Sequence, residues 1–238
     1  MAESLLTLST ATSLASVAVT RGEQLLGELT INPAGNQSDV LLLAVDRLLQ
    51  DLDLSLDQFD AFAAVHGPGA FTGLRVGVAT IKGLALATGK PVVGVSSLQA
   101  LALQVSDASC PVYALLDARK GEVYAACFNW QDGLPQLVGC EKVLDPSLLL
   151  DEVTSDANFV GDGCSVYRTL IVRKLGARAR FAPWSANTLR AGSAAMLALQ
   201  QIRASGTTTP ELINPVYIRP SDAEINKQKT AADNCIEG

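Results

Sequence analysis

One arrangement of strands and helices occurs twice in this chain, and the repetition constrains the fold more than any other feature. In the first half, strand-like segments at 5–8 and 15–20 are separated by a polar turn, and a third follows at 24–31. In the second half, the segment 111–128 has the same order of strand, polar turn and strand. A repeated alternation of this kind predicts an α/β fold with two duplicated lobes.

A Gly-x-Gly turn marks the same place in both halves. A short apolar strand leads into Gly67 and Gly69 in the first half, and into Gly161 and Gly163 in the second. A helix-like stretch follows each turn. The two turns therefore strengthen the prediction that the lobes arose by duplication.

The lobe boundary is expected near residue 106. We predict that residues 1–106 form the N-terminal lobe and residues 107–225 the C-terminal lobe, and that 226–238 is a polar tail that frays. The last apolar helix is expected at 185–202, because its apolar residues recur with helical spacing.

Composition excludes several classes of protein. The chain has 238 residues, of which 48% are hydrophobic and 18% charged, so it can bury a large core and is not intrinsically disordered. Its net charge of -6 argues against a protein that clamps nucleic acid by itself. No apolar run is long enough to span a bilayer and no basic leader precedes the first strand, so we expect a cytoplasmic protein.

Metal and triad chemistry are poorly supported by the residue types. The five cysteines are scattered, with no Cys-x-x-Cys pair, and His66 is the single histidine. A protein zinc or iron site needs several His or Cys ligands at close spacing, and a hydrolase triad would depend wholly on His66. We therefore predict no metal, no cofactor and no catalytic residue.

The glycine-rich turn before the helix that starts near Gly73 has two interpretations. Gly67 and Gly69 with Thr72 as the helix N-cap make an anion site, since free N–H groups and the positive helix end face a phosphate. A Gly-x-Gly turn alone is weak support for nucleotide binding, because such turns are common and no Walker lysine follows.

The helix after this turn carries glycines four residues apart. Gly73 and Gly77 share one face, and glycine within a helix costs about 1 kcal/mol relative to alanine, so a second backbone is expected to approach them. An apolar stripe of Leu74, Val78 and Ile81 adjoins them. This face belongs either to the chain's own core or to a contact with a partner, and the spacing does not separate the two.

A second amphipathic helix is predicted after residue 37. Ser38 is its expected N-cap and Asp39 its first-turn acid. The apolar positions have helical spacing and include Leu41, Leu42, Val45, Leu48 and Leu49.

The segment "GPGAFTGLRVGVATIKGLALATGKPVVGVSSLQALA" closely resembles the TsaB (YeaZ) family. The stretches "LLTLSTATSLASVAV", "LLDARKGEVYAACF", "VGDG" and "VYIRPSDAE" extend the resemblance over nearly the whole chain. The family is a bacterial subunit of the machinery that makes threonylcarbamoyladenosine on tRNA. The resemblance implies two lobes of the actin, Hsp70 and sugar-kinase type, which agrees with the duplicated pattern.

The resemblance also implies a non-catalytic role. TsaB-like proteins support the catalytic subunit TsaD, which transfers the threonylcarbamoyl group, by forming a heterodimer through N-lobe helices. The residues that match those helices are Ser38, Leu41, Leu42, Val45, Leu49, Gly73, Leu74, Arg75, Gly77, Val78 and Ile81. The ATPase TsaE joins the complex, the family also forms homodimers through the same surface, and tRNA is expected to be contacted only indirectly.

Two positions depart from the family pattern. Ser9 stands where the first strand usually ends in aspartate, which weakens any claim of nucleotide hydrolysis. Gln37 stands where the first interface helix usually has histidine, so a contact made by that histidine would fall to Gln37. An ATPase or kinase of the same fold is the alternative function, and Asp117 and Asp162 are the acids at equivalent turns. A peptidase is a further alternative, for which neither a metal site nor a triad can be assembled.

Overall fold

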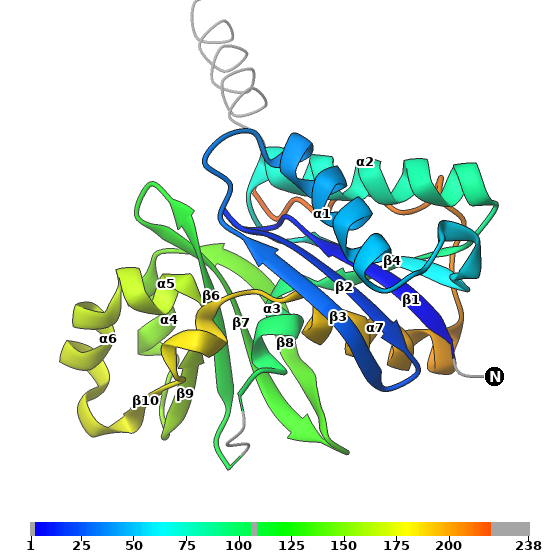
Figure 1. Cartoon of the computed structure of the whole chain (residues 1–238). Coiled ribbons are helices and arrows are strands. Elements are labelled where there is room, and N and C mark those ends of the chain that lie inside the picture. The colour runs from blue at the N-terminus through cyan, green and yellow to red at the C-terminus, as the bar shows by residue number, and fades with distance from the viewer. Residues whose placement is uncertain (1–2, 106–108, 220–238) are drawn as a thin grey trace, which may run out of the picture.

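The computed structural model describes residues 3–105 and 109–219, and they form two five-stranded sheets (Figure 1). The first has the strand order β3-β2-β1-β4-β5, and the second has the order β10-β9-β6-β7-β8. The strands of the first sheet are β1 (Ser4–Ser9), β2 (Ala15–Arg21), β3 (Gln24–Ile31), β4 (Ala61–Gly67) and β5 (Val92–Ser96). Those of the second are β6 (Val112–Arg119), β7 (Glu122–Gln131), β8 (Leu134–Leu144), β9 (Ala157–Val160) and β10 (Ala179–Phe181).

The two sheets have the same topology. In each, the first three strands form an antiparallel meander, and the fourth strand pairs in parallel with the first. The fifth strand pairs in parallel with the fourth at the sheet edge. The predicted α/β fold with two duplicated lobes is therefore confirmed.

Helices cover the sheets in layers. Helices α1 (Gln37–Asp51) and α2 (Phe71–Thr88) lie on one face of the first sheet, while α3 (Ser97–Ala102) and α7 (Ala191–Ser205) lie between the two sheets. Helices α4 (Pro146–Asp151), α5 (Asp162–Val166) and α6 (Arg168–Leu175) cover the outer face of the second sheet. Three 3-10 turns complete the described elements: η1 (Leu56–Gln58), η2 (Gly176–Arg178) and η3 (Trp184–Asn187).

Three predicted helix boundaries are wrong. Helix α1 is capped by Asn36, whose side chain accepts from the Ser38 backbone N–H, so Ser38 lies in the first turn rather than at the cap. Helix α2 begins at Phe71, and Thr72 is already helical. The helix expected at 185–202 is divided into η3 and α7, because the chain is extended between them.

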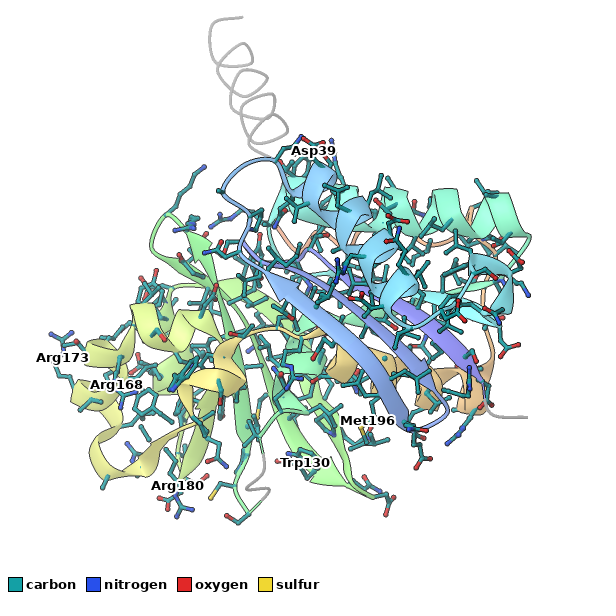
Figure 2. All side chains as sticks on the ribbon, in the orientation of Figure 1. Asp39, Trp130, Arg168, Arg173, Arg180 and Met196 are labelled. Atoms are coloured by element: carbon teal, nitrogen blue, oxygen red, sulfur yellow. The ribbon has the colours of Figure 1, made fainter. Side chains whose placement is uncertain are left out.

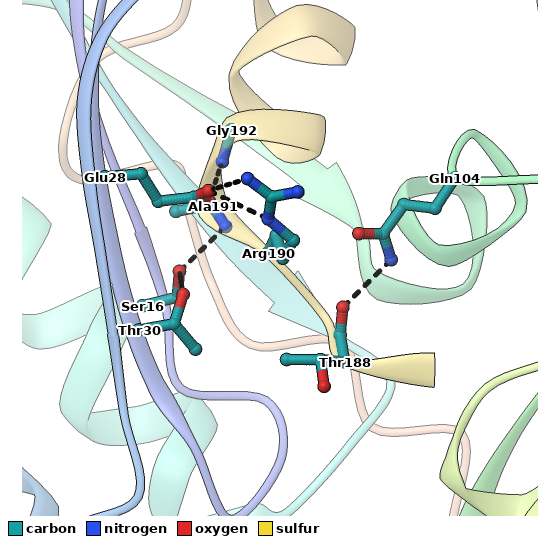
Figure 3. A network of polar contacts seen from close by, with 8 residues as sticks. All are labelled: Ser16, Glu28, Thr30, Gln104, Thr188, Arg190, Ala191 and Gly192. Carbon is teal, nitrogen blue, oxygen red and sulfur yellow. Dashed lines mark hydrogen bonds and ion pairs between the residues drawn. The ribbon is translucent and has the colours of Figure 1, made fainter. Parts of the chain in front are cut away.

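The lobe assignment of the last helix is also wrong. Helix α7 packs against the strands of the first sheet, although it was expected in the lobe formed by residues 107–225. Glu28 of β3 fixes its first turn, because the carboxylate accepts from the Gly192 N–H at 2.8 Å and pairs with Arg190 (Figure 3). Ser16 accepts from the Ala191 N–H beside it. The expected lobe boundary near 106 and the tail at 226–238 lie outside the described residues.

The largest apolar cluster lies between the two sheets. It includes Leu5 and Val95 of the first sheet, Leu116 of the second, and Leu98 and Ala198 of the helices between them. This shared core joins the two lobes. It lies beside a cavity that is lined by the β1–β2 turn of the first lobe and the β6–β7 turn of the second. Within the described residues, no helix is both long enough and apolar enough to cross a membrane.

Candidate functional site

The glycine face of α2 contacts the chain's own first hairpin. A Cβ at Gly73 would overlap the Thr10 carbonyl oxygen, and one at Gly77 would overlap the Thr10 hydroxyl. That hydroxyl donates to the Gly73 carbonyl oxygen at 2.6 Å. The close approach predicted from the two glycines is therefore correct, but the backbone that approaches belongs to the same chain, so these glycines do not face a partner.

Most of the predicted interface side chains are buried in the chain's own core. The residues concerned are no more than 8% exposed, and they are Leu41, Val45, Leu49, Leu74, Val78 and Ile81. They pack with β1, β2 and β4 beneath α1 and α2. The expectation that these six side chains contact a partner is therefore wrong, since one apolar stripe cannot face the sheet and a second protein together.

A different set of residues forms the outer side of the two helices. Leu42 and Leu43 of α1 are 54% and 69% exposed, and Leu86 of α2 is 61% exposed. Gly83 lies on the same helix with open space where a Cβ would stand, unlike Gly73 and Gly77. Of these residues, the family resemblance predicts only Leu42 at the interface; the run of three leucines at 41–43 is the sequence signal that α1 has apolar residues on two sides.

The second feature is a cavity of about 660 Å³ where the lobes meet. It lies at the β1–β2 turn, at the start of α2 and at the β6–β7 turn of the second lobe. Its lining from the first lobe includes Thr12, Ser13, Gly69, Ala70, Phe71 and Arg75, and from the second lobe Asp117, Arg119, Lys120, Tyr124 and Asp162. Tyr217 and Arg219 complete it, and the sequence analysis gave neither a role.

The two acids in this cavity are occupied by backbone contacts. Asp162 accepts from the Asp117 N–H at 2.9 Å, and Asp117 accepts from the Arg119 N–H at 2.9 Å. Burial raises the pKa of Asp162 above its ordinary value, and the Asp117 N–H partly offsets this. Both carboxylates therefore stabilise the conformation of the backbone at the β6–β7 turn, as Asp side chains commonly do in turns.

The four glycines of the candidate nucleotide loops lie against the chain's own backbone. Gly67 and Gly161 have φ values of 137° and 107°, which only glycine adopts readily. A Cβ at Gly69 would overlap the Ala11 carbonyl oxygen, and Cβ atoms at Gly161 and Gly163 would press on Leu115. These glycines are accounted for by close packing of each loop on its lobe, and Gly69 also lines the cavity.

Arg75 lies at the rim of the cavity in an aromatic setting. Its guanidinium lies 3.9 Å from the centre of the Phe71 ring, and its Nε donates to the Tyr217 hydroxyl at 2.8 Å. The Phe71 and Tyr217 rings lie 4.8 Å apart. Arg219, two residues after Tyr217, donates to the Ala118 carbonyl oxygen of β6 and so links the segment after α7 to the second lobe.

His66 is a packed residue of β4. Its ring lies against Gly94 of β5, where a Cβ would overlap the imidazole Nδ1. Burial lowers the pKa of His66 below the ordinary value. Within residues 3–105 and 109–219, no group of three or more His, Cys, Asp and Glu side chains could hold a metal ion.

Comparison with known proteins identifies relatives along nearly the whole chain. The family model described as "TsaD: tRNA N6-adenosine threonylcarbamoyltransferase" matches residues 31–227. The chain is 32% identical to the tRNA threonylcarbamoyladenosine biosynthesis protein TsaB of Haemophilus influenzae over 190 residues, which are 72% of this chain and 77% of that protein. It is 27% identical to the TsaB protein of Bacillus subtilis over 223 residues, 92% of this chain and 96% of the relative.

A solved structure agrees with these relatives. YeaZ from Pseudomonas aeruginosa superposes with a TM-score of 0.78 at 31% sequence identity, and the match covers 90% of this chain and 99% of that one. The likeness therefore extends to both lobes and includes the helices α1 and α2.

Proposed function

Since this chain belongs to the TsaB (YeaZ) family, we propose that it takes part in forming N6-threonylcarbamoyladenosine on tRNA as a non-catalytic subunit that binds TsaD. The relatives are named for this biosynthesis, and the family model that matches residues 31–227 is that of the transferase itself. The chain is thus a relative of the enzyme that it is proposed to support.

The observation that carries the proposal is the exposed apolar side of α1 and α2, which we define as Leu42, Leu43, Ala79, Gly83 and Leu86 and call the helix surface. Both helices lie side by side on the outer face of the first sheet (Figure 1). Leucines that stay this exposed gain about 25 cal/mol per Å² when a partner covers them. The small residues of the helix surface, Ala79 and Gly83, would let a helix of the partner come close.

The same surface is proposed for self-association in the absence of TsaD. Because one surface would serve both contacts, the homodimer and the heterodimer with TsaD exclude each other. TsaE is proposed to join the assembled complex through other surfaces. The aspartates at the lobe junction support a non-catalytic role, since Asp117 and Asp162 are committed to backbone hydrogen bonds.

The test is a matched pair of substitutions at equally exposed leucines. Leu86→Asp changes the helix surface, and Leu148→Asp changes α4 of the second lobe; both leucines are 61% exposed. In a pull-down with tagged TsaD, we expect Leu86→Asp to abolish binding and Leu148→Asp to leave it unchanged. Circular dichroism checks that both variants are folded. Retained binding by Leu86→Asp would place the interface elsewhere.

Nucleotide binding, with ATPase or kinase activity, is the second candidate function, and the 660 Å³ cavity favours it. The start of α2 and the side chains of Arg75 and Arg119 make the cavity attractive to an anion. Titration calorimetry of the isolated chain with ADP and ATP tests binding, and a turnover assay tests hydrolysis. Heat of binding that is lost in Arg119→Ala would support this candidate. The peptidase alternative finds no support in the residues of the cavity.

A further inference from the structure

The second lobe carries a concentration of positive charge that the function proposed above does not use. Five of the chain's 18 Lys and Arg residues lie between residues 168 and 180, and this stretch contains no Asp or Glu. They are Arg168, Arg173, Lys174, Arg178 and Arg180, and we call them the basic surface. In a chain with a net charge of -6, this segment is therefore a local excess of positive charge.

The basic surface lies at the outer end of the second lobe. It is formed by α6, η2 and β10, and β10 is the edge strand of its sheet. Figure 2 shows Arg168, Arg173 and Arg180 together at this end, and Asp39 at the start of α1 far from them. A ligand on the basic surface would therefore leave the helix surface open for TsaD.

The charges of the basic surface are only partly balanced. Lys174 pairs with Asp151 at 2.6 Å, and Arg180 pairs with Asp156 at 2.9 Å. Arg178 donates to the Val153 carbonyl oxygen and forms no ion pair with a carboxylate of the described residues. Arg173 is exposed and forms no ion pair with any residue of the described chain.

Arg168 is held in a geometry suited to a planar anion or base. The Arg168 guanidinium lies 4.0 Å from the centre of the Phe181 ring, so the ring covers one face of the guanidinium. Arg168 is nevertheless an exposed residue. Four of the five cations are arginine, whose fixed fork matches phosphate oxygens better than lysine does. Trp184, three residues after Phe181, is 85% exposed, and exposed aromatic rings are typical stacking partners for unpaired bases.

We propose that the basic surface contacts the phosphate backbone of the tRNA on which the complex acts. The inference rests on the proposed function, because that function makes tRNA the polyanion that the assembly must hold. It replaces the expectation that tRNA is reached only through TsaD. Each arginine that meets a phosphate releases a counterion, so the contact strengthens tRNA binding in a salt-dependent way.

The experiment measures tRNA affinity of the complex between this chain and TsaD by fluorescence anisotropy, with a labelled transcript that reads an ANN codon. Arg168→Ala/Arg173→Ala removes two cations that have no carboxylate partner. Arg21→Ala/Lys90→Ala removes two positive charges from the first lobe, at residues that form no ion pair with another described residue, and is the matched control. We expect several-fold weaker binding in the first double variant, and a salt slope lower by about two, with no change in the control.

Three outcomes overturn the inference. If both double variants bind tRNA with the affinity and salt dependence of the wild-type chain, the basic surface does not contact tRNA. If both lose the same amount of tRNA affinity, the effect is one of overall charge and not of this surface. Binding of the wild-type chain to phosphatidylserine vesicles that is lost in Arg168→Ala/Arg173→Ala, with tRNA affinity unchanged, would make this a membrane-facing surface. Pull-down of TsaD by each variant is measured separately, so a failure of the heterodimer is distinguished from a failure of tRNA contact. If the heterodimer fails, the isolated chain with the same transcript at low salt still tests the surface.

Discussion

Two glycines of α2 are predicted to respond to alanine in opposite directions. Gly83 lies in the helix with open space at its Cβ position, whereas a Cβ at Gly73 meets the Thr10 carbonyl oxygen, which is backbone and cannot turn away. The helix and the substitution are the same at both sites, but Gly73 lies in the first turn of α2, where alanine gains less over glycine than it does at the interior Gly83. A loss of stability in Gly73→Ala, in place of a small gain, therefore reports the contact with the first hairpin.

The magnitudes follow from three effects. Alanine gains about 1 kcal/mol over glycine within a helix, so Gly83→Ala is expected to raise the free energy of unfolding by about that amount. At Gly73, in the first turn, this gain is at most as large, and it is opposed by overpacking of about 1–3 kcal/mol. If α2 shifts to relieve the overlap, the hydrogen bond from Thr10 is lost as well, at about 1 kcal/mol. We expect a net loss of about 1–3 kcal/mol for Gly73→Ala.

Urea unfolding followed by circular dichroism measures both variants against the wild-type chain. Each curve is recorded at two protein concentrations, because self-association stabilises a folded chain by mass action. An unchanged dependence of the free energy on urea shows that only stability has changed. A Gly73→Ala variant at least as stable as the wild type would refute the contact between α2 and the first hairpin.

Three further perturbations test the core, the lobe contact and the histidine. Leu41→Ala is expected to cost about 2–5 kcal/mol and the neighbouring Leu42→Ala less than about 0.5 kcal/mol, because the side chains are 0% and 54% exposed; urea unfolding measures both. Glu28→Ala is expected to cost about 1–3 kcal/mol in the same assay, because it leaves Arg190 and the start of α7 without their acceptor; an unchanged midpoint would contradict the role given to this carboxylate. Because burial lowers the pKa of His66 from 6.5, the unfolded chain binds the proton more readily. The stabilising contribution is therefore full above the ordinary pKa and is lost as pH falls from there through the lower folded value, so His66→Gln should flatten the pH dependence of the unfolding free energy below about pH 7.

Local patterns were sufficient for the strands and for the duplication. Alternating apolar residues placed β1, β2 and β3 close to their true bounds. Strand β8 was not predicted, because its apolar residues are broken by polar and charged ones that face solvent at the edge of the second sheet. The start of α2 was missed because Ala70 caps it without a side-chain hydrogen bond, whereas the start of α1 was missed because Asn36, and not Ser38, is its cap.

The sequence by itself determined that this chain has two related α/β lobes, that Gly73 and Gly77 accept a closely approaching backbone, and that the family is TsaB (YeaZ). Only the tertiary structure decided which backbone approaches, because an apolar or glycine stripe shows that a helix face is covered without showing what covers it. The same holds for α7, whose place on the first sheet depends on contacts such as that of Glu28, more than 160 residues away in sequence. Spacing along a helix is local information, whereas burial depends on segments that only folding brings together.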